Sequence, residues 1–136
     1  MTENKTSFSE FKSKSGLKRI MSAASYSMQG FKAAWRNEHA FRQELAVVVP
    51  AMLLALFLPL PAVHRLALVA VLINLLIVEL LNSAIETVVD RISLERHPLS
   101  KVAKDVGSAA VFLALLLAAA TWIVILLPLA RAFFTA

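Results

Sequence analysis

The chain has 136 residues, of which 59% are hydrophobic, and it carries a net charge of +5 and a mean hydropathy of +0.72. A soluble domain of this length is far less apolar, so the composition favours an integral membrane protein. The sequence contains no cysteine, which excludes disulfides and thiolate metal sites. Its basic residues flank apolar runs rather than alternate with aromatic residues, so we expect no nucleic-acid partner.

The N-terminal part divides into a polar tail and a helix. Residues 1–16 are rich in Ser, Thr and Lys, which predicts a disordered tail. In residues 17–36, basic residues lie at the flanks and apolar ones recur at helical spacing, at Ile20, Ala24, Phe31 and Trp35. This pattern predicts an amphipathic helix on the membrane surface.

The first membrane span is expected over about residues 41–60. Its apolar run, with a snorkelling Arg42 at one end, reaches the roughly 20 residues that a spanning helix needs. Pro50 predicts a kink inside the helix, and Pro59 and Pro61 predict a tight turn after it.

Two further spans follow. Residues 63–92 contain no Gly or Pro and predict a helix of roughly 45 Å, which exceeds the roughly 30 Å hydrocarbon core. The polar stretch Ser93–Lys104, which contains Pro98, predicts a loop or helix break. The third span is expected over about residues 105–130, and its small residues near Gly107 predict close helix packing.

The basic residues set the expected orientation. Eight of the 14 lie before the first span and four lie between the second and third spans, whereas only Arg65 and Arg131 lie on the other side. Positive charge gathers in the cytoplasm, so the N-terminus and the second loop are expected to be cytoplasmic. The sequence therefore predicts an all-α membrane protein with one domain, residues 17–136, made of a surface helix and three transmembrane helices.

Four polar residues form a stripe at the cytoplasmic end of the second span. At 100° per residue, three of them fall within about 60° of the first: Glu79, Asn82, Glu86 and Asp90. An ionisable group inside a membrane costs at least roughly 2.5 to 3.5 kcal/mol, so its default interpretation is a functional site. The structural alternative is an ion pair of Glu79 with Arg42 or Lys104.

Further charged residues are expected at the same membrane face. Glu38 and Glu44 flank the start of the first span, and carboxylates from several segments suit a hard divalent cation such as Mg²⁺. An ion pair between Glu38 and Arg42 is the alternative for Glu38. Lys104 and Asp105 add a cation and an anion, with interfacial anchoring as their alternative role.

Other common sites are absent from the sequence. The three histidines, His39, His64 and His97, show no zinc-binding spacing. Only three glycines occur, which excludes the P-loop and the kinase glycine-rich loop. A bound nucleotide would therefore be held by metal and side chains.

Three motifs carry a family resemblance. They read WRNEHAFRQE from Trp35 to Glu44, ELLNSAIETVVDR from Glu79 to Arg91, and AKDVGSAA from Ala103 to Ala110. These motifs resemble the prokaryotic integral-membrane diacylglycerol kinases, and the resemblance covers about residues 17–127. It implies ATP- and Mg²⁺-dependent transfer of the γ-phosphoryl group to diacylglycerol, which gives phosphatidic acid. It also implies a homotrimer in the bacterial inner membrane, with sites between subunits.

The resemblance also implies a role for each matching residue. Glu79 is similar to the general base, and Glu38 and Glu86 to ligands of the ATP-bound metal. The nucleotide-side positions are Arg19, Tyr26, Glu38, Glu86, Glu95, His97, Lys104 and Asp105. The lipid-side positions are Arg19, Ser27, Trp35, Arg42, Glu79 and Ser108. The supporting polar positions are Glu44, Asn82 and Asp90.

Two alternative functions stay open at this point. An undecaprenol kinase of the same fold would carry the same catalytic block, because that block does not distinguish a glycerol hydroxyl from a polyprenol hydroxyl. A small transporter or proton conduit would also contain an intramembrane Glu. A conduit needs polar residues through the full depth, however, and Asn74 is the exception in the otherwise apolar outer halves of the spans. An interhelical hydrogen bond is the expected role of Asn74.

Overall fold

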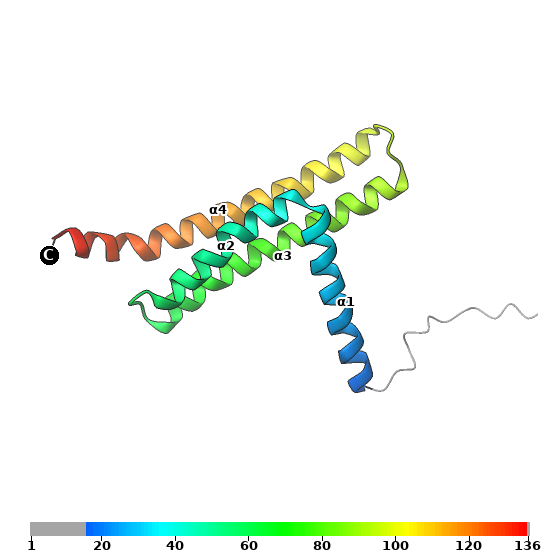
Figure 1. Ribbon diagram of the computed structural model, residues 1–136. Coiled ribbons are helices and arrows are strands. Elements are labelled where there is room, and N and C mark those ends of the chain that lie inside the picture. Colours follow the sequence, from blue (N-terminus) through cyan, green and yellow to red (C-terminus); the bar gives the residue numbers. More distant parts are fainter. Residues whose placement is uncertain (1–15, 136) are drawn as a thin grey trace, which may run out of the picture.

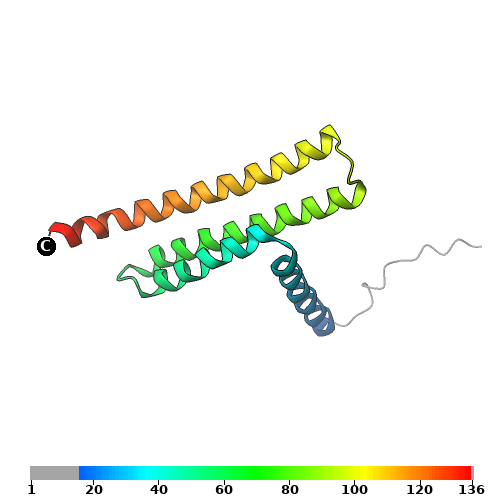
Figure 2. The same cartoon turned by 45° about the horizontal axis from the view of Figure 1, so that its top comes forward.

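Four helices make up the part of the chain that the computed structural model describes, residues 16–135, with side chains described as far as residue 132. They are α1 (Gly16–Asn37), α2 (His39–Phe57), α3 (Ala62–Ile92) and α4 (Pro98–Thr135). α3 packs against both α2 and α4, and these three helices run side by side. α1 is transverse to them and projects away from the bundle (Figure 1). The same arrangement is seen from a second direction in Figure 2. The tail expected over residues 1–16 lies outside the described residues except for Gly16.

The predicted fold class is confirmed. α2, α3 and α4 are each long and apolar enough to cross a membrane. α3 has 31 residues, and at 1.5 Å per residue it is roughly 46 Å long, so one end extends beyond a hydrocarbon core of about 30 Å. α1 exposes most of its large apolar side chains, among them Ile20, Met28 and Phe31. An exposed apolar face on a helix transverse to the spans is typical of a helix that lies on the membrane surface.

The turn between α2 and α3 follows from its prolines. Leu58 and Pro61 have extended backbones, as expected for a residue before Pro59 and for a proline that precedes a helix. α2 therefore ends at Phe57, three residues before the expected limit, while Pro50 is accommodated inside it. Arg65 Nη1 donates to the Leu56 carbonyl at 3.3 Å, which satisfies one free acceptor at the end of α2.

The second turn is shorter than the sequence suggested. The loop was expected over residues 93–104, but α4 already begins at Pro98. A proline in the first helical turn loses no hydrogen bond, because the N–H groups there have no partner in the helix. His97 caps the new helix, since its Nδ1 accepts from the Leu99 N–H at 3.2 Å and its carbonyl accepts from the Lys101 N–H at 3.1 Å.

Small residues bring the helices close together. The core joins Val48 of α2, Leu72 and Leu75 of α3, and Ala114 of α4, and Trp122 packs against it. The Trp122 indole N–H donates to the Leu68 carbonyl at 3.3 Å, which links α4 to α3. Small side chains at a contact allow helix backbones to approach in lipid.

The expected close packing at Gly107 is present. A Cβ at this position would overlap the Asn82 side-chain oxygen and would lie 3.4 Å from Asn82 Cγ. α4 therefore presses against α3 at the level of the acidic stripe, and only glycine fits this contact without displacing Asn82.

Candidate active site

Glu38 occupies the junction between α1 and α2. It is the one residue between the two helices, with φ −106° and ψ 111°, and its carboxylate makes no capping hydrogen bond. The alternative ion pair with Arg42 does not form. Arg42 Nη1 instead donates to the carbonyls of Trp35 at 2.7 Å and Arg36 at 3.3 Å, and its Nη2 lies 2.8 Å from His39 Nδ1. Arg42 thus caps the C-terminal end of α1, and the Glu38 carboxylate is not engaged in an ion pair with it.

The carboxylates gather around Glu79 on α3. Glu79 is only 3% exposed, and the charges of Glu38, Glu86 and Glu44 all lie close enough to interact with it. The alternative pairing of Glu79 with Arg42 or Lys104 is not observed within residues 16–132, because both cations bind elsewhere. Like charges held close together in a buried position favour binding of a positive group.

Asn82 orients one of these carboxylates. Its amide Nδ2 donates to Glu86 Oε1 at 3.3 Å, and its own oxygen is buried against Gly107 with no hydrogen-bond partner in the described part of the chain. The contact with α4 therefore fixes the Asn82 side chain, and Asn82 in turn supports Glu86. The supporting role that the family resemblance implies for Asn82 stays a prediction.

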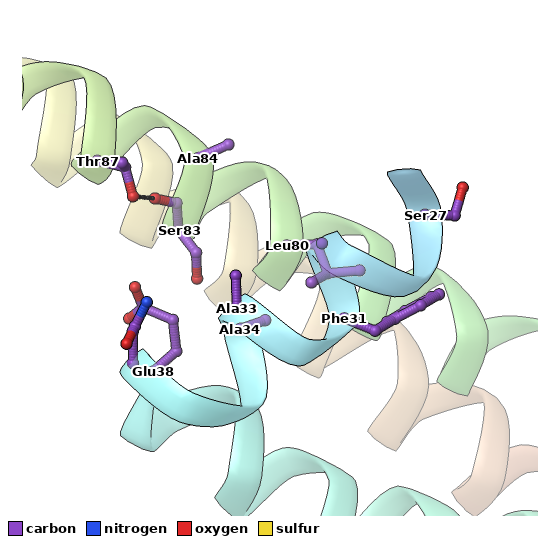
Figure 3. Close-up of a pocket in the computed structure, with 11 residues that line it drawn as sticks. Ser27, Phe31, Ala33, Ala34, Glu38, Leu80, Ser83, Ala84 and Thr87 are labelled. Atoms are coloured by element: carbon purple, nitrogen blue, oxygen red, sulfur yellow. Dashed lines mark hydrogen bonds between the residues drawn. The ribbon is translucent and has the colours of Figure 1, made fainter. Parts of the chain in front are cut away.

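A cleft of about 480 Å³ separates α1 from α3 beside this cluster. Its lining is mostly small or apolar, with polar groups contributed by Ser27, Asn37, Glu38, Ser83 and Thr87. Figure 3 shows Ser83 of α3 and Glu38 of the junction on facing sides of the cleft. Sequence reasoning missed Ser83, although its position four residues after Glu79 places it on the same helical face.

A second cleft, of about 650 Å³, lies at the turn between α3 and α4. Five of the predicted site residues line it: Asp90, Glu95, His97, Lys104 and Asp105. Lys104 Nζ lies 2.7 Å from Asp90 Oδ1, and Lys101 Nζ lies 2.5 Å from Asp105 Oδ2. The charge of Lys104 also interacts with that of Glu86, so it links this cleft to the carboxylate cluster.

The remaining predicted residues lie apart from these groups in a single chain. Arg19 and Tyr26 are on α1 and line neither cleft. Trp35 is 53% exposed and lines a shallow groove with Phe41. Ser108 is exposed on α4, next to Gly107.

The acidic residues suit a magnesium ion only if substrate phosphates and water complete its coordination. Among the described residues, no three acidic or histidine side chains are close enough to hold a metal by themselves. Mg²⁺ at phosphate-transfer sites is held by one or two carboxylates together with substrate phosphates and water. Glu38 and Glu86, which both interact with Glu79, supply oxygen ligands of this kind. The residues present therefore fit a metal that is bound together with a nucleotide.

Comparisons with known proteins agree on one family. The family described as prokaryotic diacylglycerol kinase matches residues 25–126. A diacylglycerol kinase of Pseudomonas aeruginosa is 55% identical over 119 residues, which is 88% of this chain and 97% of the relative. The Escherichia coli K12 diacylglycerol kinase is 50% identical over 111 residues, 82% of this chain and 91% of the relative. A Helicobacter pylori diacylglycerol kinase is 37% identical over 107 residues, 79% and 84% of the two chains. The chain belongs to the prokaryotic diacylglycerol kinase family.

Proposed function

We propose that the chain is a membrane kinase that transfers the γ-phosphoryl group of ATP to diacylglycerol and produces phosphatidic acid. The observation that carries this proposal is the burial of Glu79 within a group of carboxylates, beside a cleft large enough for a lipid headgroup. Family membership and the names of the relatives support the same activity.

Glu79 acts as the general base. It takes the proton of the lipid hydroxyl as that oxygen forms a bond to the γ-phosphorus, and the bond between this phosphorus and the β–γ bridging oxygen breaks to release ADP. Phosphoryl transfer depends on positioning and charge neutralisation more than on covalent help. A single well-placed base is therefore sufficient on the acceptor side.

Glu38 and Glu86 would hold the metal that accompanies the nucleotide, and Asn82 keeps Glu86 in position through their hydrogen bond. The proposed metal is Mg²⁺, which when bound would neutralise charge on the phosphates. Lys104, with its neighbours at the α3–α4 turn, binds the phosphates from the other side. Its ammonium group contacts Asp90 at 2.7 Å and interacts with the charge of Glu86.

The membrane arrangement follows from charge and exposure. The clefts lie on the cytoplasmic side of the bacterial inner membrane in this proposal, which the positive-inside distribution of basic residues supports and where ATP is available. Arg19 and Tyr26 complete the nucleotide side, and Trp35 and Ser108 the lipid side, from other copies of the chain in a homotrimer. This assembly accounts for predicted residues that lie apart within one chain. Arg42 serves the lipid side from its place beside Glu38.

The rival functions are less well supported. A proton conduit needs polar groups along the whole bundle, but the core at Val48, Leu68 and Leu72 is apolar. Undecaprenol remains the alternative acceptor, although the relatives that match over most of the chain are named as diacylglycerol kinases.

The test is a direct transfer assay. Purified protein in detergent micelles receives ATP with labelled γ-phosphate, Mg²⁺ and either dioleoylglycerol or undecaprenol. We expect label in phosphatidic acid and at most weak labelling of undecaprenol. Preferential labelling of undecaprenol would assign the rival acceptor, and no labelled lipid with either acceptor would refute the kinase proposal.

A further inference from the structure

The hydroxyl groups that line the cleft between α1 and α3 differ in their hydrogen bonding. Ser27 Oγ donates to the Ala23 carbonyl at 3.0 Å, and Thr87 Oγ1 donates to the Ser83 carbonyl at 2.9 Å. Both bonds go to the residue four positions earlier, the usual arrangement for a hydroxyl inside a helix. Ser83 is different, because its Oγ is buried and has no partner within the part of the chain that the structure describes.

The Ser83 hydroxyl is both buried and directed into the cleft. Ser83 is 8% exposed, and Figure 3 shows its side chain projecting from α3 toward the space between α3 and the end of α1. A buried hydroxyl without a hydrogen bond is energetically unfavourable. Its retention at a cleft surface therefore indicates a partner that is bound during function.

The position of Ser83 identifies that partner. Ser83 is four residues after Glu79 and three before Glu86, so it lies within one helical turn of both on nearly the same face. Asn82 lies about 100° away around the helix, on the side that contacts α4. A group held by Ser83 would therefore lie between the proposed base and the proposed metal ligand, on the side of the cleft between α1 and α3.

We infer that the Ser83 hydroxyl hydrogen-bonds the reacting hydroxyl of the lipid alcohol and positions it between Glu79 and the metal-bound phosphate. This inference rests on the proposed kinase function and assigns a further substrate-contacting residue to it. The small residues around Ser83, among them Ala33, Ala34 and Ala84, leave room for a glycerol group and the start of its acyl chains.

The experiment compares wild type, Ser83→Ala and Ser83→Thr in mixed micelles that contain dioleoylglycerol. Loss of one neutral hydrogen bond is expected to lower kcat/KM for the lipid roughly three- to tenfold in Ser83→Ala. The KM for ATP should stay unchanged, and Ser83→Thr should retain most of the lipid activity because it keeps the hydroxyl. Thr121→Ala is the matched control, since that hydroxyl donates to the Leu117 carbonyl of its own helix at 2.8 Å.

Thermal unfolding without substrate separates this role from a structural one. Removal of an unsatisfied hydroxyl should leave the Tm of Ser83→Ala unchanged or higher, whereas a structural hydroxyl would lower it. Lipid kinetics equal to those of the wild type, or a change confined to the KM for ATP, would overturn the inference alone. A wild-type protein that phosphorylates no lipid would overturn both the inference and the proposed function.

Discussion

The two parts of the acidic stripe on α3 hold their polar groups in different ways. Near the middle of the helix, Glu79 is buried among other carboxylates, and the side-chain oxygens of Asn82 and Ser83 have no hydrogen-bond partner among residues 16–132. At the end of the helix, Asp90 is half-exposed and paired with Lys104. The buried part therefore keeps an unfavourable arrangement, which in the proposed function a bound substrate relieves. The exposed part holds an ion pair that can exchange one anion for another at small cost.

The largest expected effect tests the buried part. Glu79→Gln keeps the shape of the side chain but removes the base, so kcat should fall by roughly 10²- to 10⁴-fold. ATP binding, measured by equilibrium dialysis with Mg²⁺, should persist because the proposed function places Glu79 at the lipid hydroxyl and not at the nucleotide. Turnover near the wild-type level would remove Glu79 from the base role.

Glu86→Gln should act on the metal rather than on proton transfer. One carboxylate ligand is lost, so the Mg²⁺ concentration that gives half-maximal activity should rise about 10- to 100-fold. A titration of phosphatidic acid formation with Mg²⁺ measures this change. An unaltered Mg²⁺ requirement would contradict the ligand assignment, whatever happens to kcat.

Substitutions of two lysines near the α3–α4 turn test whether the position of a positive charge matters in the exposed part. Lys104→Met removes the charge that interacts with Asp90 and Glu86, and the KM for ATP should rise about tenfold. Lys101→Met breaks only a pair within α4, with Asp105, so its effect on the same KM should be smaller. Equal effects would mean that net charge, rather than the position of Lys104, governs nucleotide binding.

The smallest expected effect concerns the contact that supports the buried part. Gly107→Ala forces the Asn82 side chain to move, which should lower the free energy of unfolding by about 1 to 3 kcal/mol. Because Asn82 then loses its bond to Glu86, the Mg²⁺ requirement should also rise modestly.

Gly16→Ala is the matched control for this substitution. A Cβ at Gly16 meets no described residue within 4 Å, so the Tm and the Mg²⁺ dependence of Gly16→Ala should stay at the wild-type values. Thermal unfolding in detergent and the Mg²⁺ titration measure both variants. If Gly107→Ala matched Gly16→Ala in both Tm and Mg²⁺ requirement, the contact between Gly107 and Asn82 would not be what positions Asn82.

Much of the fold followed from periodicity. α3 begins and ends within one residue of the expected range because no Gly or Pro interrupts its apolar pattern. The start of α4 was misplaced because Pro98 was interpreted as a break, whereas it stands at the first helical position with His97 as its cap. Sequence pattern alone does not distinguish a proline that ends one helix from a proline that begins the next.

The sequence by itself determined that the chain is helical and apolar enough for a membrane, and that α3 carries acidic residues on one face, because helical period and residue polarity are local properties. Only the tertiary structure decided which polar groups are satisfied. It showed Arg42 bound to the end of α1 instead of to Glu38, and Lys104 bound to Asp90 instead of to Glu79. It also showed Ser83 buried with no hydrogen-bond partner in the described part of the chain. Hydrogen-bond satisfaction depends on groups far apart in the chain, so it becomes visible only when the helices are packed.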